Sequence, residues 1–133
     1  MEKNSPVDLA ALDVTSAAEK GAVLQLTHPV SGVELDISIR LAGMDSEQYQ
    51  KAQRAAVNKR VNKRRRTPLD PEELAEESYT LLAKVTLGWE GIVLDGELIP
   101  FSQENARMIY KRFPWIREQV DQFTTDRGNF LQD

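Results

Sequence analysis

The feature that most constrains the fold is a strict alternation of apolar and polar residues from Val33 to Leu41. The apolar positions are Val33, Leu35, Ile37, Ile39 and Leu41, and the residues between them are Glu34, Asp36, Ser38 and Arg40. Side chains of a strand point to opposite faces in turn, so this pattern predicts a strand with one buried face. Residues 22–28 contain Val23, Leu24 and Leu26, and Pro29-Val30-Ser31-Gly32 between the two segments is a turn signal. We therefore expect a β-hairpin over residues 22–41.

Helix signals follow the hairpin. Asp45 or Ser46 can cap a first helix, and Asp70 before Pro71 has the spacing of a capping box with Glu73. Ser102 and Pro114 are typical first residues of two further helices. The expected helices span residues 46–66, 71–87, 102–112 and 114–126. The predicted fold class is α+β, mostly α, with an N-terminal β-hairpin followed by about four helices.

A chain of 133 residues suits one domain. Residues 1–19 lack a clear apolar period, so we expect a flexible N-terminal arm there and a single domain over residues 20–133. Asp95-Gly96 lies between short apolar segments, which fits a tight loop and a short hairpin equally well.

The composition excludes several kinds of functional site. There is no cysteine, so disulfides, thiolate metal sites and a thiol nucleophile are excluded. His28, the single histidine, falls at the hairpin turn and has no second histidine to share a metal ion. No glycine-rich phosphate-binding motif occurs, and no signal peptide or membrane-spanning run is visible. We expect a protein that is not an enzyme, binds no metal or cofactor, does not enter a membrane and stays in the compartment where it is made.

The charge distribution is uneven. Residues 51–66 hold eight of the 17 basic residues and none of the 21 acidic ones. The rest of the chain therefore has nine basic and 21 acidic residues, a net charge of -12 beside a segment of +8. The candidate partner-binding residues of this basic run are Arg54, Lys59, Arg60, Lys63, Arg64, Arg65 and Arg66.

Three interpretations of the basic run remain open. Its side chains can be solvated or face the acidic helix start at Glu72, Glu73, Glu76 and Glu77, where exposed pairs contribute only ~0–1 kcal/mol each. They can bind a protein partner. Nucleic acid binding is the least favoured, because no aromatic residue interrupts residues 51–66 and the whole chain is acidic.

Both tryptophans and all four phenylalanines lie between Trp89 and Leu131. Four short motifs follow one another in this segment: Trp89-Glu90-Gly91-Ile92, Ile99-Pro100-Phe101-Ser102-Gln103-Glu104-Asn105, Phe113-Pro114-Trp115-Ile116-Arg117-Glu118-Gln119-Val120 and Asn129-Phe130-Leu131. Their order and spacing resemble the small tail assembly chaperones of tailed bacteriophages and prophages. The resemblance covers residues 80–131, about two-fifths of the chain.

This resemblance implies a non-enzymatic assembly factor. Such chaperones bind the tape measure protein, help recruit tail tube (major tail) subunits, and are absent from the finished particle. The resemblance also implies that the protein acts in the host bacterial cytoplasm and has no catalytic residues. The motif residues then have structural roles in packing, turns, helix boundaries and caps: Trp89, Gly91, Gly96, Pro100, Phe101, Ser102, Asn105, Phe113, Pro114, Trp115 and Phe130.

Two other functions stay open on the sequence. One is a nucleic-acid-binding accessory protein that uses residues 51–66, and the other is a structural virion component such as a head–tail connector. The exposed edge of the predicted hairpin and the thin apolar stripe of residues 46–66 also suggest self-association.

Overall fold

An antiparallel three-stranded sheet forms the base of the computed structural model, which describes residues 6–62 and 70–131. Its strands are β1 (Ala22–Thr27), β2 (Glu34–Leu41) and β3 (Thr86–Glu90), in the order β1-β2-β3. In the register, Ile39 lies opposite Leu24 on one side and Trp89 on the other. The apolar alternation of β2 therefore supplies the buried face of the central strand, and Leu26, Ile39 and Leu41 are fully buried.

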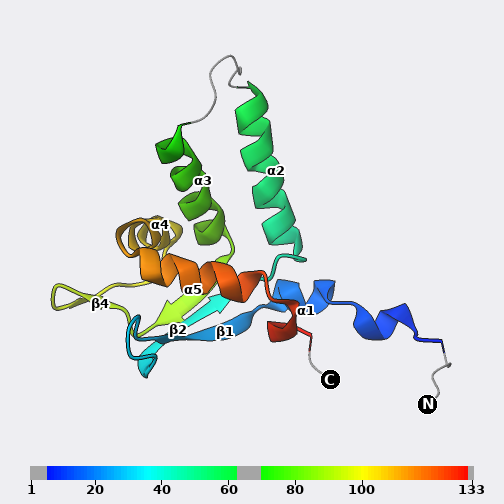
Figure 1. The fold of residues 1–133 in the computed structure, drawn as a ribbon, viewed down its shortest axis with the longest axis horizontal. Helices are drawn as coiled ribbons and strands as arrows, with labels where there is room; N and C mark the ends of the chain where they lie inside the picture. Colours follow the sequence, from blue (N-terminus) through cyan, green and yellow to red (C-terminus); the bar gives the residue numbers. More distant parts are fainter. Residues whose placement is uncertain (1–5, 63–69, 132–133) are drawn as a thin grey trace.

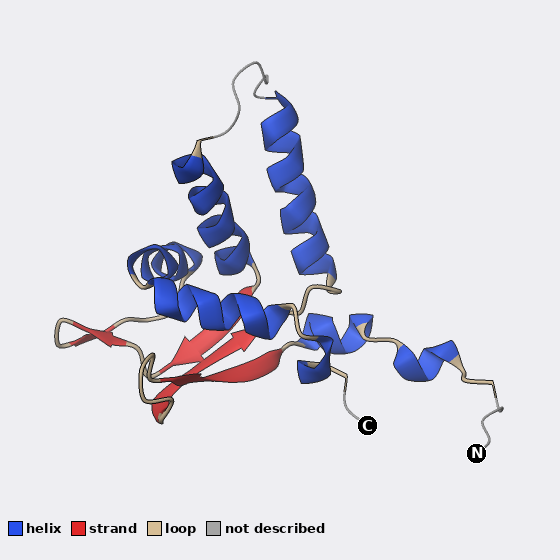
Figure 2. Ribbon diagram, in the orientation of Figure 1, coloured by secondary structure: helices blue, strands red, loops and turns tan. Residues whose placement is uncertain are grey.

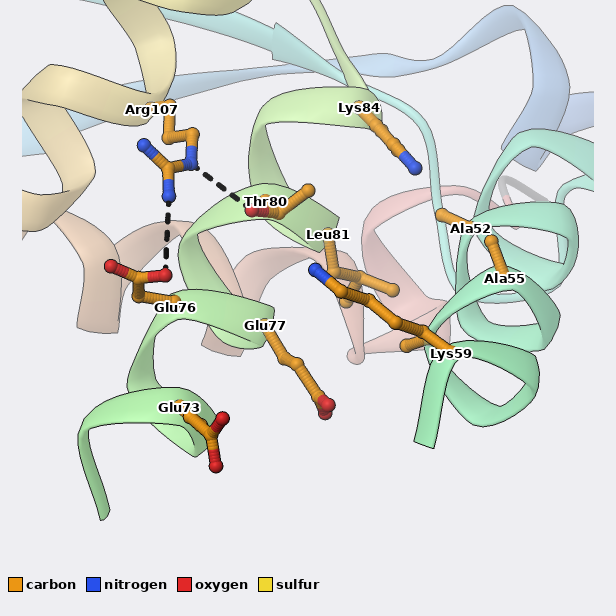
Figure 3. Close-up of a pocket in the computed structure, with 11 residues that line it drawn as sticks. Ala52, Ala55, Lys59, Glu73, Glu76, Glu77, Thr80, Leu81, Lys84 and Arg107 are labelled. Carbon is orange, nitrogen blue, oxygen red and sulfur yellow. Dashed lines mark hydrogen bonds and ion pairs between the residues drawn. The ribbon is translucent and has the colours of Figure 1, made fainter. Parts of the chain in front are cut away.

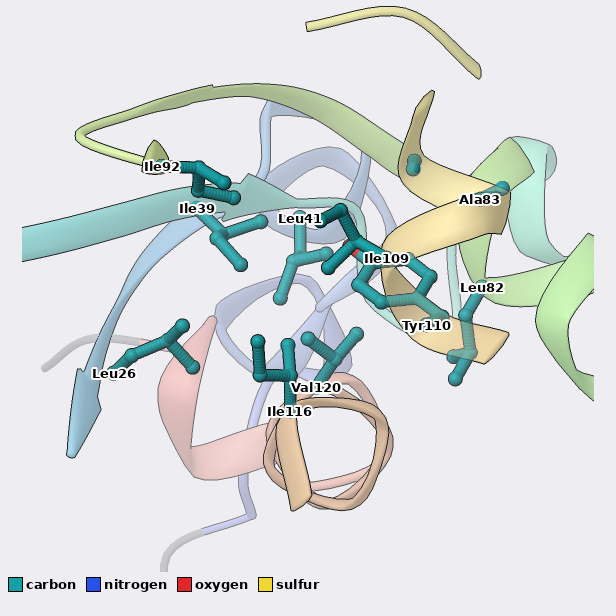
Figure 4. Close-up of a cluster of buried hydrophobic side chains, with 11 residues drawn as sticks. Leu26, Ile39, Leu41, Leu82, Ala83, Ile92, Ile109, Tyr110, Ile116 and Val120 are labelled. Atoms are coloured by element: carbon teal, nitrogen blue, oxygen red, sulfur yellow. The ribbon is translucent and has the colours of Figure 1, made fainter. Parts of the chain in front are cut away.

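Two helices, α4 (Gln103–Arg112) and α5 (Pro114–Thr124), lie over that face of the sheet (Figure 1). Figure 4 shows the strand side chains pointing toward Ile116 and Val120 of α5 and toward Ile109 and Tyr110 of α4. The buried cluster consists of Leu26, Ile39, Leu41, Leu82, Ala83, Ile92, Ala106, Ile109, Tyr110, Ile116 and Val120. The main core is thus a sheet covered by helices on one side.

The other long helices, α2 (Glu47–Asn62) and α3 (Pro71–Lys84), project side by side away from the sheet (Figure 2). Ser46 starts α2, and its Oγ accepts a hydrogen bond from the Tyr49 amide at 3.0 Å. Asp70 starts α3 with a capping box, because its carboxylate accepts from the Glu73 amide at 2.8 Å and the Glu73 carboxylate accepts from the Asp70 amide at 3.3 Å. A second small core of Ala42, Tyr49 and Val85 holds the base of the pair.

Short elements complete the described chain. The 3-10 helix η1 (Leu9–Leu12) and helix α1 (Thr15–Lys20) precede the sheet, and the 3-10 helix η2 (Arg127–Asn129) follows α5. Strands β4 (Val93–Leu94) and β5 (Glu97–Leu98) form a small hairpin, in which Asp95 and Gly96 have φ angles of 52° and 84°. Both are left-handed, as a tight two-residue turn requires.

The expected fold, one N-terminal hairpin followed by about four helices, is wrong. The described residues form an α+β, mostly helical fold with five α-helices and two small sheets, and the strands are not confined to the N-terminal hairpin. The predicted helix 71–87 ends at Lys84, and β3 begins at Thr86. Val85 and Leu87 continue the apolar spacing of the helix, but the open edge of β2 needs a hydrogen-bonding partner and β3 provides it.

Other boundaries are close to the expected ones. The predicted helix 46–66 is α2 as far as Asn62, and its last four residues lie outside the described residues. In the segment expected to be a flexible arm, α1 has one buried residue, Ala18, whose carbonyl accepts from the Gly43 amide at 3.0 Å. The division into residues 1–19 and 20–133 stays a prediction. No helix among the described residues has the length and apolar character to cross a membrane.

Candidate partner-binding grooves

A groove of about 430 Å³ runs between α2 and α3, and we call it the alanine groove (Figure 3). Residues three and four apart share one face of a helix, which places Ala52, Ala55, Ala56 and Lys59 of α2 on the same side. The full lining is Ala52, Ala55, Ala56, Lys59, Glu73, Glu76, Glu77, Thr80, Leu81, Lys84 and Arg107. The groove therefore combines small apolar side chains on its α2 side with a charged rim.

The rim of the alanine groove carries both signs of charge. Arg107 reaches across from α4, where its Nε donates to Thr80 Oγ1 at 3.1 Å and its Nη2 lies 3.6 Å from Glu76 Oε1. Figure 3 shows Lys59 extending from α2 toward α3. The Arg107 and Glu76 side chains are 43% and 50% exposed, so their pairing contributes ~0–1 kcal/mol to stability. The pair links α4 to the acidic side chains of α3 at the groove.

A second groove, of about 590 Å³, flanks the same helix pair, and we call it the valine–leucine groove. Its lining is Gln53, Arg54, Ala56, Val57, Asn58, Leu74, Glu77, Ser78 and Leu81. Ala56, Glu77 and Leu81 line both grooves, so they mark the boundary between the two along α2 and α3. Val57 and Leu74 remain 46% and 49% exposed in this groove.

The structure places the described residues of the basic run on different surfaces. Arg54 lines the valine–leucine groove and Lys59 lines the alanine groove, and both side chains are exposed. Arg60 belongs to α2, but its side chain is outside what the structure describes. Lys63, Arg64, Arg65 and Arg66 lie outside the described residues. Over the described part of α2, the basic residues therefore serve two surfaces and do not make one continuous face.

Several motif residues of the C-terminal half form one connected cluster beside β3. Trp89 Nε1 donates to the Ile99 carbonyl at 2.9 Å, and its ring meets Phe101 edge-on with the centroids 5.3 Å apart. Ser102 Oγ accepts from the Asn105 amide at 3.0 Å, which caps α4, and Asn105 Nδ2 donates to the Pro100 carbonyl at 2.9 Å. These contacts fix the chain between the small hairpin and α4.

The remaining motif residues lie at a turn, at a helix boundary or in packing contacts with the core. Gly91 has a φ of 91°, and a Cβ there would overlap the carbonyl oxygen of Asp36. Phe113 ends α4 and Pro114 begins α5, so the two helices meet at a single residue. The partly buried Trp115 packs against the core, and Phe130 meets Phe123 edge-on at 5.6 Å. None of the motif residues, all of which the structure describes, lines either groove.

Sequence reasoning found several charged residues of the grooves, but it missed the alanines, Thr80 and Arg107. The charged residues that it named are Arg54, Lys59, Glu73, Glu76 and Glu77. The spacing of Ala52, Ala55 and Ala56 was a usable signal, because small residues on one helix face permit close approach of another helix, but it reads as a weak apolar stripe. Thr80 and Arg107 are 27 positions apart and carry no local signal. Only the crossing of α3 by α4 brings them together.

Comparison with known proteins finds a family model that matches the part of the chain containing both grooves. A family model described as YdaY prophage protein matches residues 44–133, more than half of the chain. The matched segment begins just after the first hairpin, so it includes α2, α3, the lining of both grooves and every motif residue. Searches of curated proteins and of solved structures give no match.

Proposed function

We propose that this chain, which belongs to the YdaY prophage protein family, is a non-enzymatic tail assembly chaperone of a tailed phage. In this proposal it binds the tape measure protein reversibly, helps recruit tail tube subunits, works in the host bacterial cytoplasm and needs no cofactor. Membership of a prophage family supports the association with a phage. The order of the motifs between Trp89 and Leu131 supports the more specific role.

The observation that carries the proposal is the alanine groove. Small side chains on its α2 side, Ala52, Ala55 and Ala56, leave room for the backbone of a further helix to lie close to α2. Helix-in-groove recognition works in this way, with the apolar face of an amphipathic helix against a groove of this kind. The tape measure protein to which the resemblance points is long, helical and apolar, so it offers such a face repeatedly.

The charged rim would select how the partner helix lies. The acidic side chains come from α3, whereas the basic groups are Lys59 of α2, Lys84 of α3 and Arg107 of α4. Complementary charges in a partner favour one orientation and penalise the reverse one. A groove of this type binds through shape and charge together, which suits a reversible chaperone.

Co-expression with the tape measure protein of the same phage tests the function. We expect the soluble fraction of that protein to rise several-fold when this chain is present, and the two to co-purify. An unchanged soluble fraction would show that the chain is not its chaperone.

A matched pair of substitutions tests the site. Ala55→Gln places a larger polar side chain in the alanine groove, and we expect it to reduce co-purification at least several-fold. Lys51→Gln gives the same residue on an exposed position of α2 that lines neither groove, and we expect binding to persist. Both positions are exposed, so circular dichroism and thermal unfolding should match the wild type. Equal binding by both variants would place the partner elsewhere.

A further inference from the structure

Residues 6–13 form an exposed apolar segment within the region 1–19 that the sequence predicts to be flexible. From here on, the name N-terminal arm refers to residues 6–13 alone. Val7, Leu9 and Leu12 are 66%, 78% and 50% exposed, and no residue of η1 is buried. Figure 1 shows this part of the chain leading away from the sheet and from the α2–α3 pair. Three large apolar side chains within six positions are a common mark of an interaction site.

The arm is ordered by its own hydrogen bonds. The Asp8 carboxylate accepts from the Ala10 amide at 3.0 Å, which starts η1, and the Asp13 carboxylate accepts from the Thr15 amide at 2.9 Å, which leads into α1. Helix α1 is in turn held to the body by the hydrogen bond between Gly43 and Ala18. The arm is therefore presented in a defined shape, which lowers the entropic cost of binding.

The valine–leucine groove has the complementary character. Val57 and Leu74 offer partly exposed apolar surface in a groove of about 590 Å³, with Arg54 beside them. From Glu47 to Asn62, α2 has one acidic residue and four basic ones, whereas the arm has Asp8 and Asp13 and no basic residue. The apolar side chains of the arm match those of the groove, and Arg54 can pair with an arm carboxylate, although the groove lining also contains the acidic Glu77.

We propose that the N-terminal arm of one copy of this chain binds in the valine–leucine groove of a second copy. Leu9 and Leu12 lie against Val57 and Leu74, with the arm's carboxylates near Arg54. A second copy is the occupant because the arm leads away from its own α2–α3 pair (Figure 1), whose residues line the groove. The contact is small compared with stable interfaces, which bury ~1,200–2,000 Å², so the association is weak and depends on concentration. It uses a different groove from the proposed chaperone function and does not depend on that function.

Engineered cysteines test this arrangement directly, because the native chain has none. A tagged Leu9→Cys protein is mixed with an untagged Leu74→Cys protein and oxidised under mild conditions. We expect a mixed two-chain disulfide whose yield rises with concentration and exceeds that of a control pair, Leu98→Cys with Leu74→Cys, by at least several-fold. Leu98 is a suitable control because it is 69% exposed and lies on the separate β4–β5 hairpin.

A yield no higher than that of the control pair overturns the proposal. So does a doubly substituted Leu9→Cys, Leu74→Cys protein that forms its disulfide only within one chain, because that result means the arm binds its own groove.

Sedimentation velocity gives a second measurement without oxidation. We expect wild-type protein to show a larger average mass at high concentration, and Leu9→Asp with Leu12→Asp to abolish the increase without changing the circular dichroism spectrum. Arg54→Glu should weaken the association, and Ala55→Gln in the other groove should leave it intact. A wild-type protein that stays monomeric at every concentration contradicts the proposal and leaves the chaperone function untouched.

Discussion

The side-chain amide of Gln119 pairs with the backbone of Thr27 as a neighbouring strand would. Gln119 Oε1 accepts from the Thr27 amide at 3.0 Å, and Gln119 Nε2 donates to the Thr27 carbonyl at 2.9 Å. Thr27 ends the edge strand β1, and Gln119 projects from α5. The contact satisfies an open strand edge that could otherwise pair with another chain. It also gives a structural role to the glutamine of the Phe113–Val120 motif.

Replacing this glutamine should cost stability. Gln119→Ala leaves both polar groups of the Thr27 backbone without their partner in a partly buried site, so we expect a loss of ~1–3 kcal/mol. The free energy of unfolding in urea measures it. Glu118→Ala, at the exposed neighbouring position, should change stability by less than ~0.5 kcal/mol. Similar losses for the two variants would mean that the Thr27 contact contributes nothing.

Two glycines with similar backbone angles should respond differently to alanine. Gly91 and Gly96 have φ angles of 91° and 84°, so both substitutions should cost ~1–2 kcal/mol for the left-handed conformation. A Cβ at Gly91 also overlaps the Asp36 carbonyl, whereas nothing lies within 4 Å of one at Gly96. We therefore expect Gly91→Ala to lower the melting temperature clearly more than Gly96→Ala. The reverse order would show that the approach of Gly91 to β2 is not as close as described.

An ion pair near the chain's C-terminal end should make the folding stability depend on pH in the acidic range. Arg127 Nε and Nη2 donate to the two carboxylate oxygens of Asp45 at 2.6 and 2.9 Å. The hydrogen bond from Arg127 holds the pKa of Asp45 below its ordinary value. Because the folded-state pKa is lowered, this stabilisation is present above the unfolded-state pKa of about 3.9 and is lost as the pH falls through the folded-state value.

Asp45→Asn should consequently be less stable than the wild type at neutral pH, and the two should converge as the pH falls through the lowered folded-state pKa of Asp45. Arg127 is largely exposed, so the difference will be small and will shrink further in high salt. Thermal unfolding as a function of pH is the measurement. A constant difference between the two proteins down to the lowest pH would exclude this ion pair as its cause.

A buried hydroxyl pair links β3 to α4. Thr86 Oγ1 donates to the Leu82 carbonyl at 2.7 Å and lies 2.7 Å from the Tyr110 hydroxyl, which therefore donates to Thr86. Thr86→Val leaves the Tyr110 hydroxyl buried without this acceptor and should cost ~1–3 kcal/mol. Tyr110→Phe keeps the bond from Thr86 to Leu82 and should cost less, ~0.5–1.5 kcal/mol. Chemical denaturation of both variants checks the order, and a larger loss for Tyr110→Phe would contradict it.

The sequence by itself determined the features that depend on neighbouring residues. The alternation from Val33 to Leu41 and the turn before it are sufficient to indicate the paired strands β1 and β2. Asp70 with Glu73, and Ser102 with Asn105, mark the starts of α3 and α4 through caps that span three residues. The motif order likewise pointed to a phage-associated protein, which agrees with the prophage family match.

Only the tertiary structure decided the features that join distant parts of the chain. Thr86–Glu90 is a strand because β2 has an open edge, although the local apolar spacing continues the preceding helix. Gln119 contacts Thr27, 92 positions away in the sequence, and Arg107 contacts Thr80, 27 positions away. No local sequence pattern predicts either contact. The two grooves likewise depend on how α2, α3 and α4 pack. Caps and periodicity act within a few residues, whereas strand partners and groove walls are settled by which surfaces the folded chain brings together.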